Sequence, residues 1–169
     1  TSTCFVVGRR DGLIYERDPL EYPFPRADEL DASHWDPERE IAECVDVVEY
    51  TKRRVEEAPR QSHLLDEAKK GLRRRVEPLR GPALADELEK VKRNYVRQQL
   101  VTAGKERAQF WGWPNIYTYT KSIGEQVLLR SGLPACIVRP AIVESAVEFP
   151  LQGWCEGIQT STPIMYLAM

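Results

Sequence analysis

The sequence has few of the residues that build metal sites and disulfide frameworks. Its 169 residues include only 4 cysteines and 2 histidines, and no two cysteines stand in a Cys-x-x-Cys spacing. Neither His34 nor His63 has a second ligand at a metal-binding spacing, so we expect no metal site. Because such sparse cysteines are typical of a reducing compartment, we expect a cytoplasmic location.

Long apolar runs and a strong net charge are also missing. No run of 18 or more apolar residues occurs, so we expect no membrane-spanning helix within these residues. A formal net charge of -2 gives no global field that would attract nucleic acid, which we therefore exclude as a partner. The basic residues Lys69, Lys70 and Arg73–Arg75, here called the basic cluster, have acidic neighbours that favour a solvated helix face. An anionic ligand or a peripheral membrane contact is the alternative for this cluster.

The 10 glycines include no G-x-G-x-x-G pattern, so these residues lack the turn that holds a dinucleotide pyrophosphate. Apolar residues stand near both ends, at Cys4–Val7 and Pro163–Leu167, whereas free termini are usually polar. We therefore expect a fragment of a longer protein, and its oligomeric state cannot be read from the sequence.

Two apolar segments predict strands, and four segments between them predict helices. Residues 1–8 and 135–139 are short, apolar and rich in β-branched side chains, which is typical of buried strands. Caps and apolar periodicity predict helices that begin at Asp36, cover 62–76 and 82–110, and then run from 116 to 130. On the first of these helices, Ile41, Cys44, Val45, Val48 and Val55 form the expected apolar face.

This order predicts an α/β fold: part of a Rossmann-like, doubly wound parallel sheet that carries a large helical insert. We divide the chain into a strand and loop at 1–35, a helical insert at 36–110, and a third part at 111–169. The third part contains the candidate catalytic helix, the following strand and the start of a substrate-binding region.

Tyr117 and Lys121 are the strongest candidates for chemistry. Residues four apart share one face of a helix, so these two side chains can reach the same small molecule. A nearby cation favours the phenolate form of a tyrosine, which makes a phenol usable as a proton donor near neutral pH.

Three separated pieces resemble the C-terminal half of an extended short-chain dehydrogenase/reductase domain: Ser2-Thr3, Tyr117-x-x-x-Lys121 and Val138-Arg139-Pro140. The sequence from Trp113 to Gly153 resembles that of the alcohol-forming fatty acyl-CoA reductases, also called the male-sterility family. The similarity covers residues 1–16 and 111–169 well, and the charged insert less specifically.

The resemblance implies roles for individual residues. Thr3 would hydrogen-bond the substrate carbonyl, with Ser2 as the fallback; Tyr117 would donate a proton, and Lys121 would hold the cofactor ribose. Pro140, Ala141 and Ile142 would line the nicotinamide pocket, so that with Tyr117 and Lys121 they form the cofactor-binding set.

The implied reaction is the NADPH-dependent reduction of a long-chain fatty acyl-CoA, or an acyl-carrier thioester, to the aldehyde and then to the primary alcohol. Without its pyrophosphate turn the chain alone would be inactive. Two alternatives stay open: an extended short-chain reductase that acts on a sugar nucleotide or sterol, and a helical interaction module for a carrier protein, a partner domain or a membrane surface.

Overall fold

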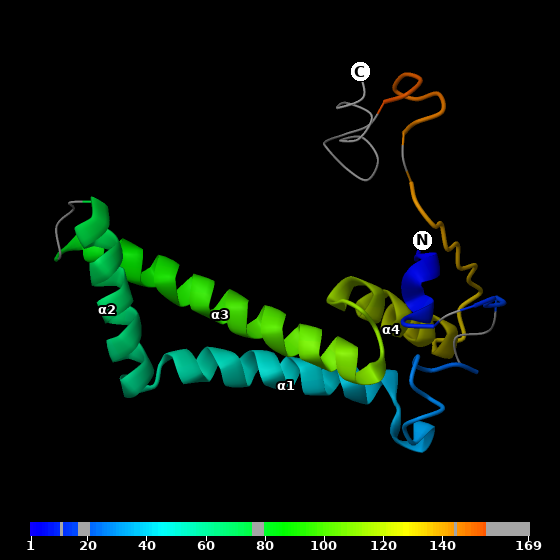
Figure 1. Cartoon of the computed structure of the whole chain (residues 1–169), viewed down its shortest axis with the longest axis horizontal. Coiled ribbons are helices and arrows are strands. Elements are labelled where there is room, and N and C mark those ends of the chain that lie inside the picture. Colours follow the sequence, from blue (N-terminus) through cyan, green and yellow to red (C-terminus); the bar gives the residue numbers. More distant parts are fainter. Residues whose placement is uncertain (11, 17–20, 76–79, 144, 155–169) are drawn as a thin grey trace.

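The computed structural model describes residues 1–10, 12–16, 21–75, 80–143 and 145–154. Regular structure in these residues is helical (Figure 1). The elements, in chain order, are the 3₁₀ helices η1 (Cys4–Val7) and η2 (Ala32–His34), followed by the α-helices α1 (Pro37–Val55), α2 (Ala58–Arg75), α3 (Pro82–Trp111) and α4 (Ile116–Arg130).

The helices α1, α2 and α3 form an elongated arm. α1 and α3 run side by side along the arm, and α2 packs on α3 at the far end (Figure 1). At the near end, α4 contacts α1, α3 and η1. The junction of these elements therefore connects the arm to the helix that carries Tyr117 and Lys121.

Local capping signals explain where the helices begin. Asp36 caps α1 by accepting a hydrogen bond of 2.8 Å from the Arg39 N–H, and Pro37 occupies the first turn. The predicted start of this helix and the predicted bounds of α4 are confirmed, and α3 is one residue longer than predicted. α2 begins at Ala58 rather than at residue 62, because Pro59 suits a first turn; its predicted last residue, 76, lies outside the described residues.

The predicted α/β fold class, with a partial Rossmann-like parallel sheet, is wrong for this structure. The described residues contain helices and no strand. Only the first three residues of the first predicted strand precede η1, and the second predicted strand, 135–139, is irregular and largely exposed.

The two segments nevertheless lie against each other. The Ser2 N–H donates to the Val138 carbonyl at 2.8 Å, and the Cys4 N–H donates to the Pro140 carbonyl at 3.2 Å. A parallel ladder needs bonds that return in the other direction, and Pro140 has no backbone N–H with which to make one. Two segments also lack the neighbouring strands that make a sheet stable. The pairing therefore stays at two hydrogen bonds.

A hydrophobic core of buried side chains lies at the junction of the arm with α4. In it Trp35 contacts Phe24 and Trp113 at centroid distances of 5.2 and 5.8 Å, and the partly buried Trp111 packs against Trp35 at 4.7 Å. Such pairs add about 0.5–1.5 kcal/mol each beyond the area that they bury. The core thus fixes the base of α4.

No helix in the described part of the chain is both long enough and apolar enough to cross a membrane. The predicted division at residues 35 and 110 stays a prediction, although α1, α2 and nearly all of α3 fall within the segment named as the insert.

Candidate active site

α4 places Tyr117 and Lys121 together on its first two turns. Asn115 caps the helix by accepting a hydrogen bond of 2.9 Å from the Thr118 N–H, which sets the helical phase two residues before Tyr117. The Lys121 Nζ lies 5.9 Å from the centre of the Tyr117 ring. Because 56% of Tyr117 is exposed, its phenol is open to a ligand.

Lys121 also joins α4 to the N-terminal segment. Its Nζ donates a hydrogen bond of 3.1 Å to the Thr1 carbonyl. The next residue, Ser2, is bound through its N–H to the Val138 carbonyl. Segments 1–4, 117–121 and 138–140, which are far apart in the sequence, therefore meet at one place.

The two candidate hydroxyls differ in their surroundings. The Thr3 Oγ1 is buried and accepts the Phe5 N–H at 3.4 Å as the cap of η1, which leaves its own O–H proton free to be donated. The Ser2 Oγ is buried and has no hydrogen-bond partner among the described residues. A buried hydroxyl without a partner is uncommon, and it marks a place where a ligand oxygen could be bound.

The predicted cofactor-lining residues begin at Pro140, the last residue of the paired segment. Pro140 is half-buried, whereas Ala141 and Ile142 are exposed. The predicted set thus offers a hydroxyl, a phenol, an ammonium and short apolar side chains, and its role as a cofactor site stays a prediction. The pyrophosphate end of a dinucleotide has no glycine-rich turn in this sequence.

An ion pair ties the 138–140 segment to α4. The Arg139 Nη2 lies 2.6 Å from the Glu125 Oε2, and its Nε donates to the Glu125 Oε1 at 3.0 Å. Glu125 is buried, so this fork-like pairing fixes the segment in orientation as well as position.

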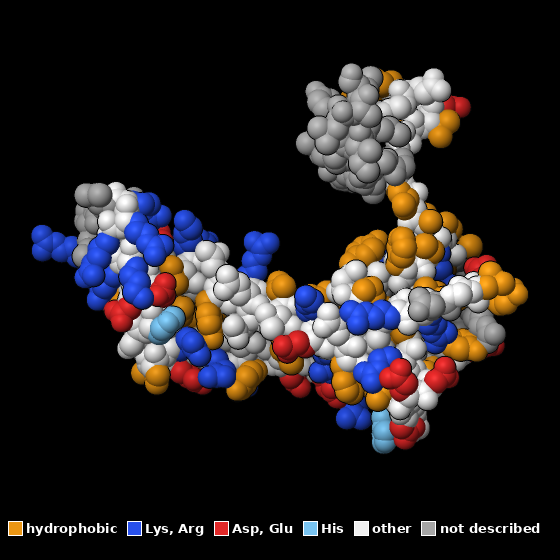
Figure 2. Space-filling model, viewed as in Figure 1, with side chains coloured by type: hydrophobic (Ala, Val, Ile, Leu, Met, Phe, Trp, Pro, Cys, Tyr) orange, Lys and Arg blue, Asp and Glu red, His pale blue; other side chains and the backbone are white. Residues whose placement is uncertain are grey.

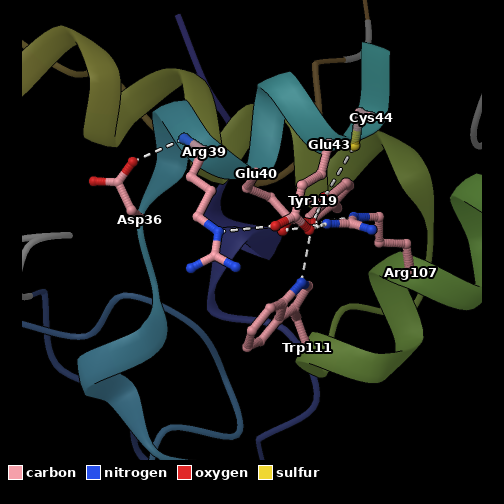
Figure 3. Close-up of polar contacts among 8 residues, drawn as sticks. All are labelled: Asp36, Arg39, Glu40, Glu43, Cys44, Arg107, Trp111 and Tyr119. Atoms are coloured by element: carbon pink, nitrogen blue, oxygen red, sulfur yellow. Dashed lines mark hydrogen bonds and ion pairs between the residues drawn. The ribbon is translucent and has the colours of Figure 1, made fainter. Parts of the chain in front are cut away.

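A second network, which the sequence did not reveal, lies where α1, α3 and α4 meet (Figure 3). Glu40 of α1 is buried and accepts hydrogen bonds from three other residues. Arg107 donates twice, at 2.5 and 2.7 Å, Trp111 Nε1 donates at 3.0 Å, and the Tyr119 hydroxyl donates through a very short bond. One carboxylate therefore links α1, α3 and α4.

The contacts of Arg107 and Tyr119 determine the protonation states of both side chains. Hydrogen bonds to Glu40 raise the pKa of Arg107 above its already high value, so the guanidinium stays charged. Burial, and then the hydrogen bond to Glu40, raise the pKa of Tyr119 far above the ordinary value, so its phenol stays neutral. The neutral phenol of Tyr119 acts as a hydrogen-bond donor. Tyr119 is buried in the core, on a different face of α4 from the exposed Tyr117.

In the sequence, Glu40 is only an acidic residue in the first turn of a predicted helix, where it suits the positive end of the helix dipole. Its partners follow 67 to 79 residues later, and no local pattern reports contacts at that distance. The one available signal was an acidic residue on the same side of the predicted helix as Cys44, which is itself close to the Tyr119 hydroxyl at 3.6 Å. Elsewhere, no group of His, Cys, Asp and Glu side chains within the described ranges could hold a metal ion.

Comparison with known proteins identifies the family. Residues 45–169 match the model of an NAD-binding family described as male sterility protein. The chain belongs to this family, which confirms the resemblance seen in the sequence. Tyr117, Lys121 and 140–142 lie inside the matched range, and Thr3 precedes it.

Several curated relatives are similar over parts of the chain. The alcohol-forming fatty acyl-CoA reductase of Simmondsia chinensis is 39% identical over 75 residues, which are 42% of this chain and 15% of that protein. The probable fatty acyl-CoA reductase 5 of Arabidopsis thaliana is 46% identical over 59 residues, covering 34% of this chain and 12% of that protein.

A longer alignment exists with the chloroplastic fatty acyl-CoA reductase 2 of Arabidopsis thaliana, which is 28% identical over 169 residues, or 97% of this chain and 21% of that protein. The chain thus spans from about an eighth to about a fifth of the length of these three relatives. No solved structure matches it.

Proposed function

We propose that this chain carries the catalytic helix of an NADPH-dependent reductase that converts long-chain fatty acyl-CoA, or an acyl-carrier thioester, to the aldehyde and then to the primary alcohol. The observation that carries the proposal is the meeting of Lys121, Tyr117 and the Ser2-Thr3 segment at one place. The names of the relatives support the substrate class, since each is called a fatty acyl-CoA reductase.

A bound reduced nicotinamide would supply the hydride that attacks the substrate carbonyl carbon. Thr3 donates a hydrogen bond to the carbonyl oxygen and stabilises the negative charge that develops there. Tyr117 donates the proton that this oxygen needs in the step from aldehyde to alcohol. In the first step the thiolate of the thioester leaves, and the aldehyde forms.

Lys121 acts in two ways in this proposal. Its ammonium favours the charge that remains on the Tyr117 oxygen after proton donation, and it binds the cofactor ribose. The bond from Lys121 to the Thr1 carbonyl keeps the amine on the same side of α4 as the hydroxyl segment. Pro140, Ala141 and Ile142 line the nicotinamide, and we place the reaction in the cytoplasm.

The decisive test is Tyr117→Phe in the full-length protein. General acid catalysis contributes about 10²- to 10⁴-fold to rate, so NADPH oxidation with the fatty aldehyde as substrate, the step in which Tyr117 gives up its proton, should fall by that factor. Tyr50→Phe is the matched control, because Tyr50 is exposed to nearly the same degree, 55% against 56%, and lies on α1. Circular dichroism should be unchanged in both variants. Undiminished turnover by Tyr117→Phe refutes the proposal.

The basic cluster supports a second candidate role as a contact for an anionic surface. Basic side chains gather at the tip of the arm where α2 meets α3 (Figure 2), and Arg73 and Arg74 are exposed there. Replacing these two arginines with glutamine should weaken binding to vesicles of anionic lipid. Turnover of a short, soluble thioester should stay the same, and a large loss of turnover argues against this role.

A further inference from the structure

A cavity lies between α1 and α3, and the proposed function gives it no role. It has a volume of about 710 Å³ and extends from α1 and α3 to the first turn of α4. This volume lies within the range of about 300–1,000 Å³ that is typical of small-molecule sites. The apolar side chains in its wall are Val47, Val48, Leu100, Ala103, Phe110 and Ile116.

The cavity is elongated along α3. Its lining on that helix runs from Leu100 to Trp111, which at about 1.5 Å per residue is about 16 Å. One leaflet of a bilayer, which is the length of one long acyl chain, measures about 15 Å. A second cavity of about 500 Å³ shares Leu100 and continues the seam toward Val55 and Val96.

The near end of the cavity reaches α4 beside Tyr117, which does not itself line the wall. Ile116, which directly precedes Tyr117, and Thr120, one turn further along the helix, stand in the wall. The Thr120 hydroxyl donates to the Tyr117 carbonyl at 3.0 Å, so this part of the wall is bonded to the turn that carries the proposed acid.

Arg107, the cation in the wall, is already paired. It binds both Glu43 and Glu40, so it is not left open to an anionic ligand there, and the acidic Glu106, also in the wall, is exposed. Gly104 is packed tightly, since a Cβ at that position would lie 3.0 Å from the Ile116 Cδ1. The cavity is therefore narrow and apolar where α3 meets α4, which suits a single hydrocarbon chain better than a helix about 10 Å in diameter.

We infer that the α1–α3 cavity binds the acyl chain of the fatty thioester, with the carbonyl at Tyr117 and the methyl end directed toward Leu100. This inference rests on the proposed function for the location of the carbonyl. The arm then measures chain length, because each methylene that enters the cavity is removed from water.

Ala103→Phe in the full-length protein tests the inference, because Ala103 is half-buried in the cavity wall. Ala85→Phe is the matched control, since Ala85 is exposed on the same helix and lines neither cavity. With palmitoyl-CoA, kcat/KM should fall about 50-fold in Ala103→Phe, which corresponds to three displaced methylenes at about 0.8 kcal/mol each. With hexanoyl-CoA it should change less than about twofold, and Ala85→Phe should resemble the wild type with both substrates.

Val47→Phe, which fills the cavity from the α1 side, should show the same dependence on chain length and guards against a local folding defect at Ala103. Equal losses with both substrates in these two variants, or no loss with either, overturn the inference.

A binding measurement separates this inference from the proposed function. Trp111 lines the cavity, so palmitoyl-CoA should change tryptophan fluorescence, and Ala103→Phe should weaken its binding while Ala85→Phe should not. A protein that binds in this way but reduces no acyl-CoA refutes the proposed function alone. Palmitoyl-CoA binding that both variants leave unchanged shows that another part of the protein or a partner covers the cavity, and it overturns the inference.

Discussion

Replacing Glu40 with glutamine should loosen α4 from the arm. The change keeps the shape of the side chain but removes the charge that Arg107, Trp111 and Tyr119 all contact. Breaking a buried ion pair by removing one partner costs about 3–5 kcal/mol. Because Arg107 keeps its second carboxylate, Glu43, we expect a value near the lower end, about 3 kcal/mol.

Hydrogen exchange of the α4 amides is the appropriate assay, because a large protein rarely unfolds in one step and exchange reports local opening. At about 1.4 kcal/mol per factor of ten, amides in residues 116–130 should exchange about 100-fold faster in Glu40→Gln. Amides of α2, which does not contact α4, should be unaffected.

Glu49→Gln provides the control for this experiment. Glu49 lies on the same helix and pairs with Lys52 at 2.9 Å, but both side chains are more than half exposed, so its loss should cost less than about 1 kcal/mol. The double variant Glu40→Gln with Tyr119→Phe should cost less than the sum of the two single changes, because both remove the same bond. Unchanged α4 exchange in Glu40→Gln, or strictly additive losses, would refute the assignment of the network as the connection between arm and α4.

Two further predictions concern stability. Gly8→Ala should destabilise the protein more than Gly12→Ala. Both glycines have positive φ, at 70° and 92°, so the backbone strain is similar. A Cβ at Gly8 would lie 2.1 Å from the Pro25 Cγ, whereas no atom lies within 4 Å of a Cβ at Gly12. Thermal unfolding should show the difference, and equal losses would contradict the clash. The pKa of Asp36 is lowered, first by the hydrogen bond from the Arg39 N–H, so its stabilisation is present above its ordinary pKa of 3.8 and is lost as pH falls through the lower folded value. Asp36→Asn should remove that part of the acid sensitivity in a pH titration of unfolding, and an unaltered acid profile would count against it.

Local signals in the sequence predicted the helices. Asp36 with Pro37 marks the start of α1, and Asn115 marks the start of α4, because a capping side chain satisfies N–H groups only a few residues away. The same reasoning brought Tyr117 and Lys121 to one helix face, and the structure places the amine near the ring. Their catalytic roles stay a prediction.

Long-range features could not be predicted in this way. Apolar periodicity placed Ile41 and Val45 on the inner face of α1, yet 43% of Ile41 and 55% of Val45 are exposed, while Glu40 points inward. A charged residue becomes acceptable there only because its partners arrive from α3 and α4. The sheet failed for a related reason, since the apolar segment 135–139 has just one extended neighbour and Pro140 withholds a donor.

The placement of Glu40 also sets an order of events during synthesis on the ribosome. Arg107, Trp111 and Tyr119 follow it by 67, 71 and 79 residues, which at about 5–20 residues per second is a delay of several seconds. Throughout that interval the Glu40 carboxylate stays hydrated. The face of nascent α1 that carries Glu40 therefore cannot be buried. This region can therefore complete its packing only after α4, which bears Tyr117 and Lys121, has been synthesised.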